Sequence, residues 1–301
     1  MESEIVLINN ETIIGKFALD LLSGSKIGKI WGITSRGLFI NLQGSIVFLT
    51  NTRYLGPVNI IANLPLIEQW KNEDELEINM SDQTINFDHS KYPVSIKIKK
   101  IWKTPPKPVL NMSDEEQQKR ILAAARQLSF LKNEQGYAPL LMPFVSDTLY
   151  LETDNTWLFS SWNTIKLLRI SMSLKNIESI LSLANLLVGS GRGLTPSGDD
   201  LLTGLTFIRR RWFPEVNWMT EVEDQLLATF KIKTTSVSST LFECAMQGEA
   251  DARIQEMADV LMSADTPFQQ QALELSRWGN SSGADVFLGM ILAIESFQNY
   301  V

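Results

Sequence analysis

Residues Gly189–Leu205 read GSGRGLTPSGDDLLTGL, a glycine-rich loop that runs into a helix with apolar spacing to Trp212. Glycines at alternate positions permit positive φ angles and a close approach of the backbone to a ligand. Thr195 and Pro196 suit the N-cap and the first position of that helix. Because the N–H groups of a first helical turn bind anions, the stretch predicts a small-anion site.

A second, degenerate copy of this stretch lies near the end of the chain, where residues 279–290 read GNSSGADVFLGM. Both copies share the pattern S-G-x-D-x-x-x-G, in which the aspartate and the second glycine lie on one helix face. We therefore expect two related loop–helix units that face one site. The pattern aligns Ser197, Gly198, Asp200 and Gly204 with Ser282, Gly283, Asp285 and Gly289.

A third polar stretch, KTTSVSSTLFECAMQGEA, covers residues 233–250. Its hydroxyl groups crowd the start of a predicted helix, where serine and threonine are common N-caps. They either cap that helix or form a hydroxyl-rich wall of the same pocket. Cys244 falls on the apolar face of the helix and is expected in the core.

The rest of the chain divides into a strand-rich and a helix-rich part, so we expect an α+β protein. Short apolar runs and the period-two segment from Val94 to Ile98 predict a small β-rich domain over residues 1–104, barrel-like or sandwich-like. Three prolines in residues 103–110 predict a linker. Residues 109–301 predict an all-helical domain of roughly eight helices that carries the TPSGDD motif. Arg209–Arg211 are expected at a solvated helix end.

Composition excludes several classes of function. The net charge of −7 argues against non-specific nucleic-acid binding, and no apolar run is long enough to span a membrane. A single cysteine and a start without signal-peptide features predict a cytoplasmic protein. With His89 as the only histidine, Ser-His-Asp catalysis is disfavoured, and no Gly-Lys-Ser/Thr completes a phosphate-binding P-loop.

Together the three polar stretches resemble a bacterial family, the AllH-type subunit of oxamate carbamoyltransferase. The resemblance rests on G-x-G-x-G-L-T-P-S-G-D-D-x-L-x-G at 189–204, on TTSVSSTLFECAMQG at 234–248 and on S-S-G-x-D at 281–285. It implies a transferase subunit in purine-nitrogen catabolism (allantoin degradation), with other subunits as partners. The assembly would transfer a carbamoyl group between oxalurate and phosphate, giving oxamate and carbamoyl phosphate, or the reverse. The alternative is a non-catalytic binding or assembly subunit that recognises a small carboxylate or phosphate; a homo-oligomer is also left open.

The candidate site residues come from these stretches. Catalytic roles are predicted for Ser197, Asp199 and Asp200. Substrate binding is predicted for Gly191, Arg192, Gly193, Thr195, Gly198, Thr234, Thr235, Ser238, Ser282, Gly283 and Asp285. Asp199 and Asp200 would hold Mg²⁺, orient Arg192, act as a base, or only favour the helix dipole.

Overall fold

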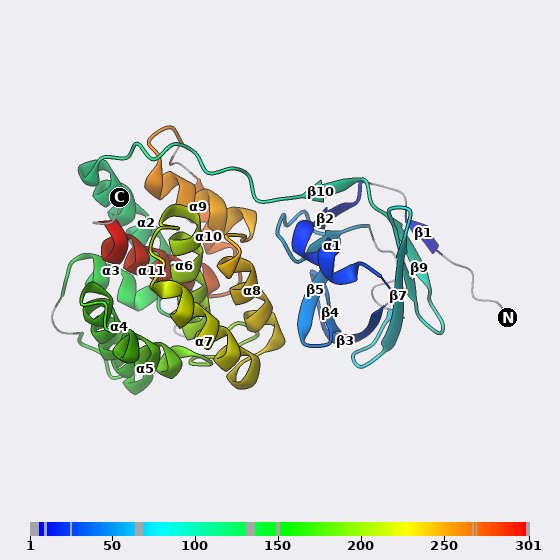
Figure 1. Ribbon diagram of the computed structural model, residues 1–301, viewed down its shortest axis with the longest axis horizontal. Helices are drawn as coiled ribbons and strands as arrows, with labels where there is room; N and C mark the ends of the chain where they lie inside the picture. Colours follow the sequence, from blue (N-terminus) through cyan, green and yellow to red (C-terminus); the bar gives the residue numbers. More distant parts are fainter. Residues whose placement is uncertain are drawn as a thin grey trace. The chain divides into compact units, whose positions relative to one another are not determined.

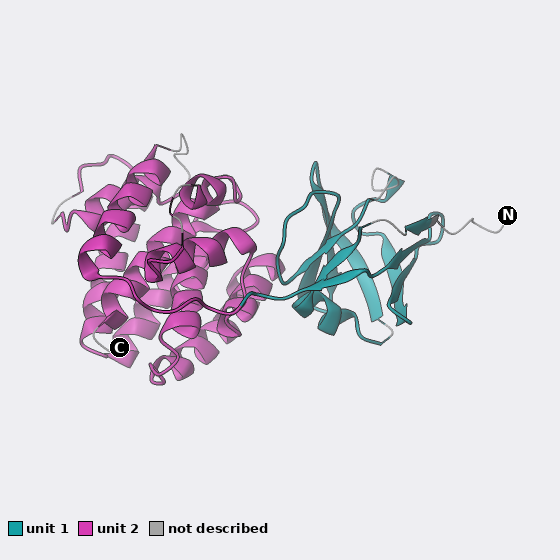
Figure 2. Cartoon of the chain, turned by 90° about the horizontal axis from the view of Figure 1, so that it is seen from above, with its two compact units in different colours: residues 1–105 teal, residues 106–301 magenta. Residues whose placement is uncertain are grey.

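The computed structural model describes residues 6–8, 11–24, 26–63, 69–130, 136–148, 151–266, 268 and 270–298. The chain divides into two compact units, Met1–Pro105 and Pro106–Val301. The first is built from strands and the second from helices (Figures 1 and 2). The protein is therefore α+β, as the sequence predicts.

The first unit is a ten-stranded sheet with one short helix. In sheet order the strands run β1-β9-β8-β7-β3-β4-β5-β6-β2-β10. Their bounds are β1 Val6–Ile8, β2 Ile13–Gly15, β3 Lys26–Thr34, β4 Gly37–Leu42, β5 Ser45–Thr50, β6 Asn59–Ile61, β7 Glu75–Ser81, β8 Thr84–Asp88, β9 Val94–Lys97 and β10 Lys100–Trp102. The segment Lys16–Leu22 forms the short helix α1.

Two short connections show that this sheet curls on itself. β1 and β2 lie near opposite ends of the strand order, yet only residues 9–12 separate them, a reach of at most about 18 Å. β9 and β10 are divided in the same way by residues 98–99. Thr12 fastens the two ends, because the amides of Lys99 and Lys100 donate to its hydroxyl and carbonyl oxygens at 3.1 Å each. The unit is a curled half-barrel with an apolar interior.

β4 and β5 pair antiparallel and form a hairpin whose turn residues are Gln43 and Gly44. Both turn residues have positive φ, 57° and 101°, as a two-residue hairpin turn requires. Sequence reasoning missed the hairpin of β7 and β8. Its turn residues, Asp82 and Gln83, also have positive φ, but no glycine marks them.

Ten helices, α2–α11, occur in the described part of the second unit. They are α2 Asp114–Ser129, α3 Ala138–Val145, α4 Thr156–Ser173, α5 Ile177–Leu187, α6 Ser197–Trp212, α7 Met219–Lys233, α8 Ser236–Met246, α9 Ala252–Met262, α10 Gln271–Ser276 and α11 Ser282–Phe297. α6 and α11 are buried along almost their whole length and form the centre of the core. Among the described helices, none has both the length and the apolar character needed to cross a bilayer.

The arginines at the end of α6 do not form a solvated helix end, so that expectation is wrong. Arg209 is 1% exposed and its Nε donates to Glu223 at 2.8 Å. Arg211 binds Asp259 through two hydrogen bonds of 2.8 Å. Only Arg210 is partly exposed, and it also pairs with Glu223. Buried guanidinium groups require such partners, and these lie on α7 and α9, far along the sequence.

Candidate functional site

The three polar stretches of the sequence meet in the folded protein. The hydroxyl oxygens of Thr195, before α6, and Ser282, the first residue of α11, are 3.1 Å apart. Thr235, before α8, donates its hydroxyl to the carbonyl oxygen of Leu194 at 2.6 Å. The starts of α6, α8 and α11 are thereby joined through one loop, residues 189–196.

α6 and α11 cross at the glycines that the repeat shares, and the crossing is reciprocal. A Cβ atom on Gly204 would lie 2.2 Å from the carbonyl oxygen of Val286, and one on Gly289 would lie 1.9 Å from that of Leu201. Val286 and Leu201 are themselves equivalent positions of the repeat. The two loop–helix units are thus paired about their shared pattern, and only glycine permits this backbone contact.

Two other motif glycines also serve packing. A Cβ on Gly198 would lie 2.0 Å from the carbonyl oxygen of Leu187, and one on Gly283 would lie 2.1 Å from that of Leu275. Gly198 and Gly283 are both buried. Their presence in the motif therefore has a packing explanation, whether or not a ligand binds nearby.

Asp199 fastens the glycine-rich loop to the start of α8. Its Oδ1 accepts the amide hydrogen of Gly189 at 2.7 Å, and its Oδ2 accepts the hydroxyl of Thr234. The side chain is 1% exposed, and burial raises the pKa of this carboxyl, opposed by the Gly189 amide and by the hydroxyls of Thr234 and Ser238. Asp199 is therefore satisfied by the protein itself.

Asp200 and Asp285 contact each other's repeat. The hydroxyls of Ser282 and Thr195 favour the charged form of Asp200, while the hydroxyls of Ser197 and Ser281 favour that of Asp285. Since Ser197 and Ser282 are equivalent positions, the repeats exchange serine–aspartate contacts. The structure thus brings together the two aspartates that the pattern aligns.

Both of these carboxyl groups are fully enclosed. Burial, and next the negative charge of Asp285, raises the pKa of Asp200 well above its usual range. Burial raises the pKa of Asp285 to about 6, although this carboxylate also accepts the amide hydrogen of Tyr137 at 2.5 Å. Within the described residues, Oδ2 of each aspartate has no hydrogen-bond partner.

The glycine-rich loop next to these buried groups is more exposed than they are. Arg192 and Gly193 are exposed, whereas Gly191, Thr195, Thr234 and Thr235 are half-buried. The φ angles of Gly191 and Gly193 are 117° and 97°, so both positions require glycine. We call residues 191–195 with Thr234 and Thr235 the rim.

The helix starts beneath the rim differ in their capping. Thr195 is not the N-cap of α6, as its position suggests, because Pro196 takes that place and Thr195 faces Ser282. Neither α6 nor α11 has a side-chain cap, while Thr235 caps α8 by accepting the amide hydrogen of Ser238 at 3.1 Å. In the first turns of α6 and α11 the amides of Gly198 and Gly283 donate instead to the carbonyl oxygens of Ser190 and Trp278, at 2.9 and 3.1 Å.

Sequence reasoning missed the contribution of the segment before α3. The amide of Tyr137 binds Asp285, and a Cβ on Gly136 would lie 2.3 Å from Cβ of Ser281. The Tyr137 ring stacks on Trp157 at 5.2 Å, and Trp157 donates to the Ser190 hydroxyl at 2.9 Å. The link to Asp285 depends on a backbone amide, so no side-chain pattern announces it.

The neighbouring aspartates of the motif bind different partners, Asp199 toward α8 and Asp200 toward α11. Among the described residues, no three His, Cys, Asp or Glu side chains are arranged to hold a metal ion.

Cys244 is buried, as predicted. His89 belongs to the β unit, where it contacts Asp74 at 3.0 Å.

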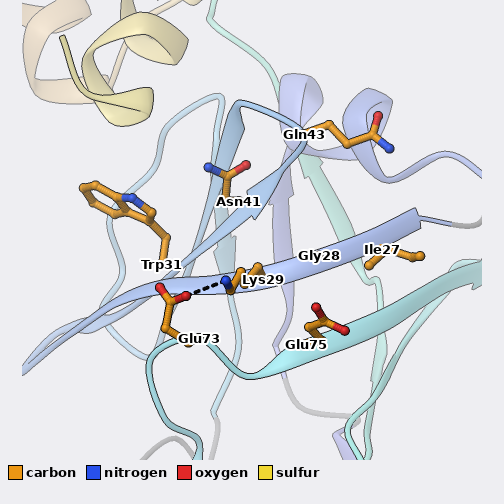
Figure 3. A pocket seen from close by; sticks show the side chains of 8 residues that line it. All are labelled: Ile27, Gly28, Lys29, Trp31, Asn41, Gln43, Glu73 and Glu75. Carbon is orange, nitrogen blue, oxygen red and sulfur yellow. Dashed lines mark ion pairs between the residues drawn. The ribbon is translucent and has the colours of Figure 1, made fainter.

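The β unit has a surface hollow of its own, of about 420 Å³, on β3, β4 and β7. Figure 3 shows Trp31 on one side and, below it, the ion pair of Lys29 with Glu73. Glu75 adds a second carboxylate and Asn41 an amide. None of these residues belongs to the polar motifs.

Comparison with known proteins gives one match. Residues 187–294 match the family described as oxamate carbamoyltransferase subunit AllH. This range contains all three meeting stretches, whereas the β unit and Tyr137 lie outside it. No curated protein and no solved structure matches the chain. Over residues 187–294 the chain thus resembles the AllH family, as its motifs predict.

Proposed function

We propose that this chain is a subunit of an oxamate carbamoyltransferase-like assembly and that its rim binds a small anion. The assembly would move a carbamoyl group between oxalurate and phosphate, with oxamate and carbamoyl phosphate on the other side of the reaction. The family matched by residues 187–294 supports the assembly. The observation that carries the anion site is the meeting of three helix starts at one glycine loop.

The chemistry of the rim suits oxamate or carbamoyl phosphate, which are both anions. The positive ends of α6, α8 and α11 share this loop, and each helix dipole favours a negative charge near its N-terminus. Arg192 is exposed beside them and offers a fork of donors that fits a carboxylate or phosphate. The hydroxyls of Thr195, Thr234 and Thr235 add donors at the same place.

Within this proposal Asp200 is the first catalytic candidate, because it lies where the two repeats exchange contacts. Ser197 takes part in that exchange through Asp285. Asp199, with both carboxyl oxygens hydrogen-bonded to the loop and to α8, holds the rim in shape. A non-catalytic binding subunit is the second candidate, favoured by the complete burial of Asp200 and Asp285.

Anion binding is tested by calorimetric titration of the purified chain with oxamate, oxalurate, carbamoyl phosphate and phosphate. Arg192→Ala should weaken the affinity about tenfold or more, since a hydrogen bond to a charged group is worth about 1.5–3 kcal/mol. Arg126→Ala, which removes an exposed arginine from α2, is the matched control and should bind like the native chain. No binding of any of these anions, or equal loss in both variants, would refute the rim site.

Catalysis is tested in the reconstituted assembly. Asp200→Asn should abolish turnover while the circular dichroism spectrum stays native. Asp114→Asn, in the first turn of α2, is the control for a first-turn aspartate and should retain turnover. Full turnover of Asp200→Asn, with anion binding intact, would establish the binding subunit in place of the catalytic one.

A further inference from the structure

The Asp200–Asp285 pair is an unbalanced concentration of negative charge in the core. The two side chains are 2% and 0% exposed, and Asp199, at 1%, lies near enough to raise the pKa of Asp200 further. Within the described residues, none of these three carboxylates takes part in an ion pair, although the buried carboxylates Glu223 and Asp259 do. Burial of an unpaired carboxylate costs several kcal/mol.

The same place holds polar atoms that lack partners. In the described part of the chain, Oδ2 of Asp200 and Oδ2 of Asp285 are buried without a hydrogen bond. Buried polar atoms are nearly always satisfied in folded proteins, so these two carboxylate oxygens leave acceptor positions open to a bound cation.

We propose that Asp200 and Asp285 bind one divalent cation, Mg²⁺, between the two loop–helix units. All the side-chain donors here are carboxylate or hydroxyl oxygens, which is the ligand type that Mg²⁺ selects. Its charge of +2 balances the two carboxylates, and Mg²⁺ commonly takes one or two carboxylates and completes its shell with water or substrate oxygens. Asp199 is excluded as a ligand, because its oxygens already accept hydrogen bonds from Gly189 and Thr234.

This ion rests on the proposed function and deepens it, because it adds positive charge to that of Arg192 and the helix N-termini at the rim. Two carboxylates alone repel an anionic substrate, whereas a bound cation attracts it. Thr195 and Ser282 link the pair to the rim, since their hydroxyls contact each other and both favour the charged form of Asp200. The cation therefore lies beneath the loop that is proposed to bind the anion.

The experiment measures cation binding to the complete chain, without substrate or partner subunits. The chelator-treated protein is titrated with MgCl₂ at constant ionic strength while its melting temperature is followed, and Mn²⁺ binding is counted by electron paramagnetic resonance. We expect the melting temperature to rise with Mg²⁺ and one Mn²⁺ to bind per chain. Asp200→Asn and Asp285→Asn should each weaken the affinity at least about a hundredfold, whereas Asp199→Asn and the control Asp114→Asn should retain it.

The metal-free variants show whether a lost response reflects misfolding. Asparagine removes one buried charge, so metal-free Asp200→Asn and Asp285→Asn should melt no lower than the metal-free native chain. Absence of any Mg²⁺ or Mn²⁺ response in the native chain would overturn the proposal. So would loss of binding in Asp199→Asn with retention in Asp285→Asn, which indicates the adjacent pair. Anion binding that survives without a metal response would leave the proposed function standing and remove only the cation.

Discussion

Replacing Gly204 by alanine tests the reciprocal crossing of α6 and α11. The added Cβ would lie 2.2 Å from the carbonyl oxygen of Val286, which is 1.2 Å short of ordinary contact at 3.4 Å. The opposing atom is backbone, so it cannot turn aside as a long side chain would. The two helices would have to move apart at the centre of the core.

Two effects of opposite sign set the size of the change. Alanine is the better helix former by about 1 kcal/mol, so without the close contact the substitution would stabilise α6. Overpacking of a well-packed core typically costs about 1–3 kcal/mol, and occasionally more. Because the clash here is with backbone, we place the net loss near the top of that range, about 3 kcal/mol. For a unit of this size, residues 106–301, that loss corresponds to a fall of about 6–12 °C in melting temperature.

The assay is thermal and urea unfolding followed by circular dichroism at the helical band. Asn163→Ala, on the exposed face of α4, is the control for helix propensity and should leave stability unchanged or slightly raise it. Gly289→Ala should resemble Gly204→Ala, since its Cβ would lie 1.9 Å from Leu201. The double variant should lower the free energy of unfolding by less than the sum of the two single losses, because both substitutions separate the same helices. A neutral or stabilising Gly204→Ala would refute the reasoning.

Three further results are expected. Glu223→Ala should cost about 3–5 kcal/mol in urea unfolding, because it leaves Arg209 buried without its partner; a loss below about 1 kcal/mol would contradict a buried ion pair. Burial raises the pKa of Glu295 to about 7 from 4.5, despite the ion pair with Arg169 at 3.1 Å. As pH rises, the unfolded chain therefore loses this proton at a lower pH than the folded chain does. The free energy of unfolding falls as pH rises from about 4.5 to 7. Glu295→Gln removes that loss, so it should be more stable than the native chain at pH 8 by up to about 3 kcal/mol and not at pH 4; an equal effect at both pH values would contradict the shift. Cys244, whose pKa burial raises well above its usual range, should react with a thiol reagent only on unfolding, and a rapid reaction in the native chain would show that it is accessible.

Much of the helical unit could be read from local signals. The boundaries of α6 and the cap of α2, where Ser113 accepts the amide of Glu116 at 3.3 Å, follow from patterns that lie within a few residues. α3 was missed because it contains Pro143, and an interior proline normally interrupts a helix. Local sequence carries little information where surrounding packing overrides such a signal.

The site shows the same division between local and distant information. The repeat S-G-x-D-x-x-x-G carried enough periodicity to predict that Asp200 and Asp285 share one place. It did not reveal that the glycines hold two helices in contact, or that Tyr137 supplies an amide to Asp285. Burial of Arg209 and Arg211 was equally hidden, since their partners lie 14 and 48 residues further along the chain.

The curled sheet of the β unit restricts how other polypeptides can associate with it. Open sheets recruit partners by adding a strand along an unpaired edge. Here β1 and β10 are the outermost strands, and Thr12 ties the segments beside them through the amides of Lys99 and Lys100. Each of these edge strands is only three residues long and offers few backbone groups to an added strand, so a neighbouring subunit that docks on this unit should recognise mainly side chains on its surface.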